Sequence, residues 1–207
     1  VSRGLGDVYK RQAGGLGARE AYGENNGWIY RWDVPHNIAD LIELMGGKEA
    51  FRNNLETMYN TPLGEAKYVF YAQLPDHTGN VGQFSMANEP SMHIPYLYNY
   101  IGEPWRTQKR VRTLLDEWFR NDLMGLPGDE DGGGMSAFVV FSMLGFYPIT
   151  PGLPIYVIGT PMFERAVIET GAGKSFEVIA HNYSPTNKYI QSVSYTHLRA
   201  HETLANL

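Results

Sequence analysis

Residues 125–144 have the sequence Gly-Leu-Pro-Gly-Asp-Glu-Asp-Gly-Gly-Gly-Met-Ser-Ala-Phe-Val-Val-Phe-Ser-Met-Leu. The first half places three acidic side chains, at positions 129–131, between Pro127-Gly128 and a run of three glycines. Glycine reaches positive φ angles at little cost and lets a ligand approach the backbone closely. This half therefore predicts a turn suited to a cation, a sugar or a water molecule. On these residues alone, a solvated acidic loop is an equal alternative.

The second half of the stretch is nearly all apolar. Residues 135–144 carry no charge, are too few to cross a membrane, and end at Gly145. They predict a helix buried on all sides, like the inner wall of a helical barrel. We expect Ser136 to cap this helix, which would place the acidic turn at a helix N-terminus, where ionised carboxylates are favoured.

A fourth carboxylate lies far upstream, in Glu24-Asn-Asn-Gly-Trp28. Two further aromatic residues, Tyr30 and Trp32, follow closely. Aromatic surface desolvates a neighbouring carboxyl group, which raises its pKa towards that of a general acid. Glu24 is therefore a candidate acid, and an ordinary exposed glutamate is the alternative.

Asn88-Glu89 offers an amide oxygen and a carboxylate just ahead of a helix predicted to begin near Pro95. Hard oxygens of this kind suit Ca²⁺, and together with the acidic turn they would supply much of a shell of six or more. An EF-hand is excluded, because the twelfth residue counted from Asp129 is Val140 and not a bidentate glutamate. The alternative for Glu89 is simple capping of the helix.

Apolar periodicity predicts three more helices. The first follows Asn37 as its N-cap and ends at Gly46-Gly47, the second begins near Lys48, and residues 60–86 are rich in loops. The third follows a loop that contains Trp105, and its polar side is expected to include Arg110, Arg112 and Glu117. The apolar positions of the second and third helices are Phe51, Leu55, Met58, Tyr59, Val111, Leu114, Leu115, Trp118 and Phe119.

The pattern changes from helical to strand-like near residue 150, so the fold class is mainly α followed by β. Short runs rich in strand-forming residues are expected at 155–158, 166–169, 176–179 and 188–193. The 207 residues are 43% hydrophobic, which suits one globular domain or one and a half.

Composition narrows the function. A net charge of −5 gives no basic face for a nucleic acid, and no apolar window is long enough for a transmembrane helix. The chain has no cysteine, which excludes disulfides and thiolate metal sites. Fourteen tyrosines and four tryptophans favour a surface that stacks on sugars, although most of these rings will be core.

The two ends differ from the rest. Residues 1–12 and 194–207 show no clear helical or strand period, and we interpret them as a non-native leader and tail. The expected organisation is therefore a helical catalytic region at 13–150 and a β-rich segment at 151–193, together an internal fragment of a longer protein.

Across about residues 13–192, motifs in matching order resemble those of glycoside hydrolase family 92. The motifs are Glu24-Asn-Asn-Gly-Trp28, Val34-Pro35-His36, Asn88-Glu89-Pro90-Ser91, Pro104-Trp105-Arg-Thr-Gln108, Gly125-Leu-Pro-Gly-Asp-Glu-Asp131, Met135-Ser-Ala137, Leu144-Gly-Phe-Tyr-Pro148 and Tyr156-Val-Ile-Gly159. The resemblance implies a calcium-dependent, inverting exo-α-mannosidase. It also implies an N-terminal β-sandwich, an (α/α)6 helical barrel and C-terminal β-strands.

The resemblance implies a role for each matching acidic residue. Glu24 would be the general acid, and Asp131, with Asp129 beside it, would activate the attacking water. Asn88 and Glu89 would help hold Ca²⁺, which would bind the 2- and 3-hydroxyls of the terminal mannose.

For substrate, the resemblance implies an α-mannoside of N-glycan type with α-1,2 linkage. Trp28, Trp105 and His93 would contact the sugar, although a lone histidine such as His93 is more often structural. The implied location is the periplasm, the bacterial cell surface or the medium.

Two residues depart from the family pattern. Met92 stands where a second histidine is usual, and Phe138 stands where tryptophan is common. With the implied sandwich and several barrel helices absent, we expect the chain by itself to be inactive. A glycosidase of the same fold with another glycan specificity, and a non-catalytic sugar-binding or structural domain, remain as alternatives.

Overall fold

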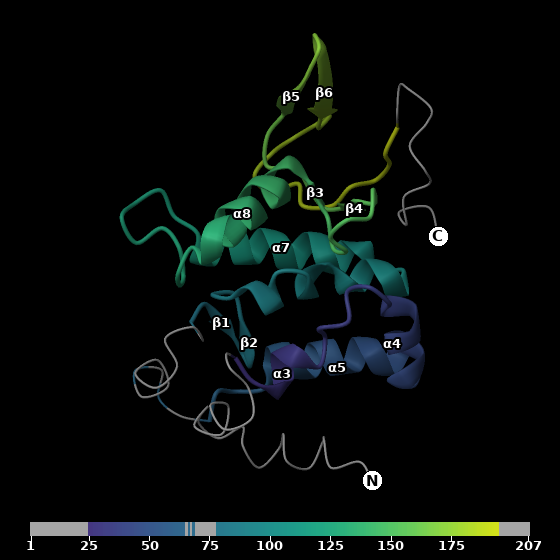
Figure 1. Cartoon of the computed structure of the whole chain (residues 1–207), viewed down its shortest axis with the longest axis vertical. Coiled ribbons are helices and arrows are strands. Elements are labelled where there is room, and N and C mark those ends of the chain that lie inside the picture. Colours follow the sequence, from purple (N-terminus) through teal and green to yellow (C-terminus); the bar gives the residue numbers. More distant parts are fainter. Residues whose placement is uncertain (1–24, 65, 67, 69–77, 195–207) are drawn as a thin grey trace. The chain divides into compact units, whose positions relative to one another are not determined.

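A computed structural model describes residues 25–64, 66, 68 and 78–194 (Figure 1). It consists of helices and short antiparallel strands. The chain divides into two units, the first formed by residues 1–94 and 118–135, the second by residues 95–117 and 136–207. None of the helices in the described part of the chain is long and apolar enough to span a membrane.

The first unit is built on two helices joined by two glycines. Helix α4 spans Ile38–Leu44 and helix α5 spans Lys48–Asn60. Asn37 caps α4 by accepting a 3.2 Å hydrogen bond from the backbone N–H of Asp40, and Gly46 and Gly47 turn the chain with φ angles of 96° and 95°. Both predictions are confirmed. The predicted apolar positions of α5 are all buried, namely Phe51, Leu55, Met58 and Tyr59.

Shorter elements cover this helix pair. Helix α3 (Gly27–Tyr30) lies against strand β2 (Phe84–Ser85) and the 3-10 helix η1 (Glu89–Ser91). Strand β2 pairs with β1 (Asn80–Val81) in a hairpin within the region predicted only as loop. The hairpin is fixed to the end of α5, because Gln83 N–H donates to the Met58 carbonyl at 2.9 Å.

In the second unit the main helices are α7 (Pro104–Trp118) and α8 (Gly134–Leu144), whose end residues extend into the first unit. The 3-10 helix η2 (Ile94–Ile101) precedes them, at the place where a helix was predicted to begin near Pro95. Val111, Leu114 and Leu115 of α7 are buried, as predicted.

Four expectations for α7 and α8 are wrong. Arg112 is buried instead of lying on a polar face, and its Nη2 donates to the Pro161 carbonyl at 3.2 Å. Trp105 lies in the first turn of α7 and not in a loop. Helix α8 begins at Gly134 without a Ser136 cap, and Val140 is 56% exposed, so the helix is not buried on all sides. Only one face of α8 is buried, the face that carries Phe138 and Ser142.

That packed face of α8 meets an aromatic cluster. Tyr96 stacks on Tyr147 with ring centroids 4.8 Å apart, and its hydroxyl lies 2.8 Å from that of Ser142. Phe138 approaches the same two rings edge-on. Burial raises the pKa of Tyr147 to about 12, so the cluster is uncharged at neutral pH.

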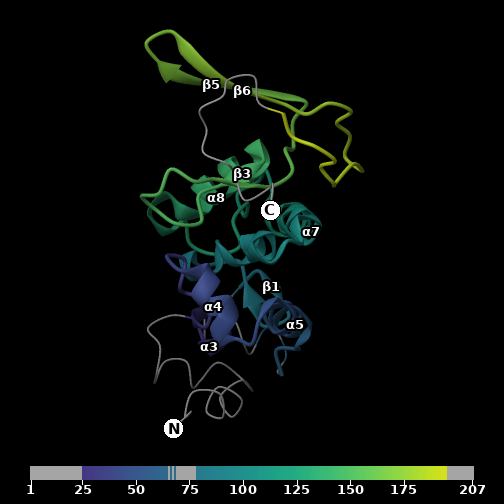
Figure 2. The same ribbon diagram turned by 90° about the vertical axis from the view of Figure 1, so that its right-hand side faces the viewer.

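The β-rich segment forms two small sheets. Strand β3 (Phe146–Tyr147) pairs with β4 (Val157–Ile158), and β5 (Arg165–Gly171) pairs with β6 (Lys174–Ile179). Figure 2 shows β5 and β6 as a ribbon that extends away from α7 and α8. Three of the four predicted strand runs thus overlap a strand.

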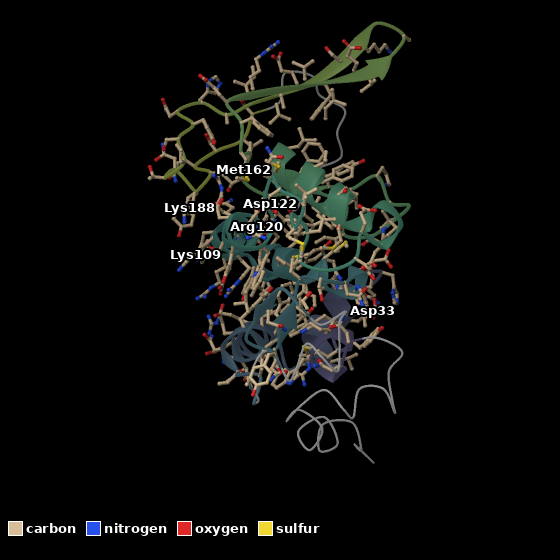
Figure 3. All side chains as sticks on the ribbon, turned by 90° about the vertical axis from the view of Figure 1, so that its left-hand side faces the viewer. Asp33, Lys109, Arg120, Asp122, Met162 and Lys188 are labelled. Atoms are coloured by element: carbon tan, nitrogen blue, oxygen red, sulfur yellow. The ribbon has the colours of Figure 1, made fainter. Side chains whose placement is uncertain are left out.

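The fourth predicted run, residues 188–193, forms no strand. Its backbone is held by side chains, since Ile190 N–H donates to Gln108 Oε1 at 3.1 Å and Thr160 Oγ1 donates to the Lys188 carbonyl at 2.7 Å. Figure 3 shows Lys188 and Lys109, from this segment and from α7, on the same side of the unit. Hydrogen bonds to side chains therefore replace a strand ladder here.

Candidate active site

The acidic loop, residues 129–131, sits in a left-handed turn. Asp131, Gly132 and Gly133 have φ angles of 57°, 63° and 106°, which confirms the turn predicted from the glycines. Aspartate tolerates this conformation better than most residues with a side chain, but it is still uncommon there. Asp129 is exposed and Asp131 is half-buried, so the two carboxylates differ in their access to water.

The N-terminal side of the loop contacts two segments, at Thr78 and at Ala87, the residue before Asn88. Thr78 Oγ1 donates a hydrogen bond to the Pro127 carbonyl. Gly128 lies so close to Ala87 that a β-carbon at position 128 would be 2.7 Å from Ala87 Cβ and 2.8 Å from its carbonyl oxygen. Only glycine fits there without displacing the backbone.

The C-terminal side of the loop is anchored to Glu89 itself. At Gly134, the first residue of α8, a β-carbon would lie 3.3 Å from Glu89 Oε1 and 3.2 Å from Met92 Cε. The Glu89 carboxylate is thus placed at the start of α8, where the helix dipole favours negative charge. The acidic loop and Asn88-Glu89, predicted as partners, lie together in the first unit.

Asn88 is buried and caps η1, accepting a 2.8 Å hydrogen bond from the Glu89 N–H at its Oδ1. The cap is thus Asn88, whereas the alternative considered from the sequence was capping by Glu89. The bond uses one of the two lone pairs of the Asn88 amide oxygen. Within the described ranges, no group of three or more His, Cys, Asp or Glu side chains is placed to hold a metal. The oxygens present suit Ca²⁺ chemically, but they are fewer than the six to eight that it takes.

His93 follows η1 and is buried, with 7% of its surface exposed. Its Nε2 lies 2.7 Å from the Trp32 carbonyl. Burial lowers the pKa of the ring, outweighing this hydrogen bond and the negative charge of Asp33, so the ring is neutral at pH 7. These contacts are those of a structural histidine.

The other predicted sugar-binding residues differ in exposure. Trp28 is only 2% exposed, and the guanidinium of Arg31 lies 5.1 Å from its ring centroid. Trp105, in the second unit, is 50% exposed and offers more surface for stacking. Glu24, the predicted general acid, lies outside the described residues.

Sequence reasoning missed Asn25, which directly follows Glu24. It has a φ angle of 47° and is 1% exposed, and within the described structure neither its amide oxygen nor its amide nitrogen has a hydrogen-bond partner. Such a combination of strain and an unsatisfied buried amide is uncommon outside functional sites. The sequence signal that could have indicated Asn25 is the pair of asparagines between the carboxylate of Glu24 and Gly27.

Comparison with known proteins identifies the family of this chain. The model of the glycosyl hydrolase family 92 catalytic domain matches residues 6–204. The chain belongs to glycosyl hydrolase family 92. The resemblance inferred from its motifs is therefore confirmed.

Solved structures from family 92 are similar in fold. An α-mannosidase of Bacteroides thetaiotaomicron, in complex with mannoimidazole, is 38% identical with a TM-score of 0.74, over 81% of this chain and 21% of that one. An inverting mannosidase of the same species is 37% identical with a TM-score of 0.67, over 81% and 23%.

A curated relative outside the bacteria also matches. An uncharacterized secreted glycosidase of Arthroderma benhamiae is 31% identical over 177 residues, which is 84% of this chain and 20% of the relative. The chain thus spans about a fifth of the length of the family 92 proteins that it matches.

Proposed function

We propose that the protein carrying this chain is a calcium-dependent, inverting exo-α-mannosidase. The observation that carries the proposal is the close packing on either side of the acidic loop, where Gly128 approaches Ala87 and Gly134 approaches Glu89. This packing occurs in a chain that belongs to family 92. Two relatives described as mannosidases, one of them inverting, support the choice of sugar and stereochemistry. We further propose that the helices belong to an (α/α)6 barrel.

In this proposal the acidic loop supplies the general base. Asp131, with Asp129 beside it, takes a proton from water as the oxygen attacks the anomeric carbon. Glu24 gives a proton to the leaving glycosidic oxygen from the opposite face of the sugar. Inversion needs about 6.5–9.5 Å between the two carboxyl groups, which leaves room for that water. An α-mannoside then yields β-mannose.

Asn88 and Glu89 would hold the calcium ion, with further oxygens from elsewhere in the protein. When bound, calcium supplies positive charge that binds hydroxyl groups of the terminal mannose. This favours distortion of the mannose ring towards the transition state. The Glu89 carboxylate also lies near the start of α8, where the helix dipole favours a negative charge.

For substrate we propose terminal mannose in α-1,2 linkage, on glycans of the N-glycan type. Trp105 offers an exposed ring for stacking, and Trp28 lies in the motif that contains Glu24. The secreted fungal relative supports action outside the cytoplasm, in the periplasm, at the cell surface or in the medium. Because most of the length of family 92 relatives lies outside this chain, we expect the chain alone to be inactive.

The test uses the full-length protein encoded by the gene that contains this chain. The purified protein is given an α-1,2-linked mannobioside, with and without a chelator, and proton NMR follows the first-formed anomer. β-Mannose formed first, and its loss with the chelator, would support the proposal. Release from another glycan would favour a different specificity, and binding without hydrolysis would favour a non-catalytic domain.

A further inference from the structure

The hydrogen bond of His93 joins two segments that are distant in the sequence. His93 Nε2 lies 2.7 Å from the carbonyl oxygen of Trp32, across 61 residues. A carbonyl oxygen only accepts, so Nε2 must carry the proton and donate it. The same oxygen also accepts the Val34 N–H at 2.7 Å, which occupies both of its lone pairs.

The Trp32 end of this bond is rigidly held. Trp32 is fully buried, and its ring meets Phe51 edge-on with centroids 5.2 Å apart. It follows α3 closely, since its N–H donates to the Ile29 carbonyl at 3.0 Å. A bond that holds Trp32 in place therefore also holds α3, within residues 25–32, the segment that directly follows Glu24.

The His93 end belongs to the segment that contacts the start of α8, just after the acidic loop. Glu89 and Met92, on the same short stretch as His93, both lie against Gly134 at the start of α8. Residues 88–93 thus contact the start of α8, which follows the acidic loop, through two side chains and the Trp32 carbonyl through a third. The bond from His93 is a polar link between the two sides, and η1 packs on α3 beside it.

We propose that His93 is a positioning residue, whose Nε2–H fixes the segment after Glu24 to the segment that carries Asn88 and Glu89. This inference rests on the proposed function and assigns His93 a role other than sugar contact. The ring is buried, and its Nε2–H is already engaged, so that proton cannot be offered to a hydroxyl group of the substrate.

Kinetics of three variants in the full-length enzyme test this role. The side chain of glutamine places an amide N–H near the position of Nε2. The side chain of asparagine is too short to place its amide N–H there, and leucine has no N–H in its side chain. We expect kcat to fall roughly 10- to 100-fold in His93→Leu and His93→Asn, since misplacing reacting groups by about 1 Å costs up to about 10²-fold. His93→Gln should recover kcat to within about threefold, with KM little changed throughout.

The control is His36→Gln, which changes an exposed histidine of the same unit and should leave both constants unchanged. All assays are run well below the melting temperature of each variant, so that lost stability does not lower kcat. Sugar contact by His93 would instead raise KM with little change in kcat, and this result would overturn the proposal. Unchanged kcat in His93→Leu would also overturn it.

Nitrogen-15 NMR of the histidine rings in the 207-residue chain separates this proposal from the proposed function. We expect the His93 ring to be neutral at pH 7, with its proton on Nε2. Its signal should vanish in His93→Gln. Absence of that signal would overturn the positioning role. An inactive wild-type enzyme with the signal present would overturn the proposed function instead.

Discussion

Gly128 is the residue at which the acidic loop comes closest to the rest of its unit. Its φ angle does not require glycine, and the constraint is the contact with Ala87. We expect Gly128→Ala to lower the free energy of unfolding by roughly 1–3 kcal/mol, the usual range for forcing an extra methyl group into a packed site. Urea denaturation of the chain measures it.

The double variant Ala87→Gly/Gly128→Ala is the matched control, because it removes one of the two overlapping β-carbons. It should recover part of the lost stability relative to the sum of the single changes, which a double-mutant cycle reports as coupling. Simple additivity would show that the two residues do not touch as described.

His93 makes a pH-dependent contribution to stability. Its pKa is below the ordinary 6.5 in the folded chain, because burial disfavours the charged ring. Below pH 6.5 the unfolded chain takes up a proton that the folded chain resists, so stability is complete above pH 6.5 and falls as the pH drops. Between pH 7.5 and 5.5, wild type should lose more stability than His93→Gln. Equal slopes in wild type and His93→Gln would contradict the assignment.

Among the elements, the start of α8 links helix formation to the Glu89 carboxylate. Gly134→Ala adds a good helix former, yet its β-carbon would crowd Glu89 Oε1 and Met92 Cε. Since both neighbours are ends of flexible side chains, we expect the melting temperature to change little. The rise in melting temperature on adding Ca²⁺ should shrink, with Ala137→Ser, exposed on the same helix, as control. An unchanged rise in melting temperature on adding Ca²⁺ would contradict the proposal that Glu89 binds the metal.

The β5–β6 hairpin should be less protected from hydrogen exchange than helix α5. In the described structure it forms a two-stranded sheet, and only Phe176 among its residues makes a ring contact, with Phe146 at 6.0 Å. Two-stranded hairpins are marginal in water. Hydrogen exchange of the chain should therefore be faster in residues 165–179 than in α5. Equal protection would show that something else covers the hairpin.

Helices were predictable where one apolar face repeats along the chain. Phe51, Leu55, Met58 and Tyr59 of α5 lie where the 3.6-residue period places them. The nearly uniform apolar sequence of α8 has no such phase, so its exposed side, at Val140, could not be predicted. Nor does local sequence reveal that Gln108 holds residue 190 away from strand pairing.

At the scale of the whole molecule, the sequence named the site residues but not the contacts that join them. Carboxylates and glycines in one loop predicted a turn with positive φ angles, and the structure has that turn; binding at the turn stays a prediction. The approach of Gly128 to Ala87, and of Gly134 to Glu89, depends on tertiary packing between distant segments. The roles of Glu24, Asp129 and Asp131 remain predictions.

The measurement that tests the account most directly is kcat for Asp131→Asn in the full-length protein. The control is Asp122→Asn, which changes an exposed carboxylate, paired with Arg120 at 3.4 Å, on the preceding turn. Loss of a general base should lower kcat about 10²- to 10⁴-fold, with KM and melting temperature little changed. A kcat within a few-fold of wild type would contradict the claim that the acidic loop activates the attacking water.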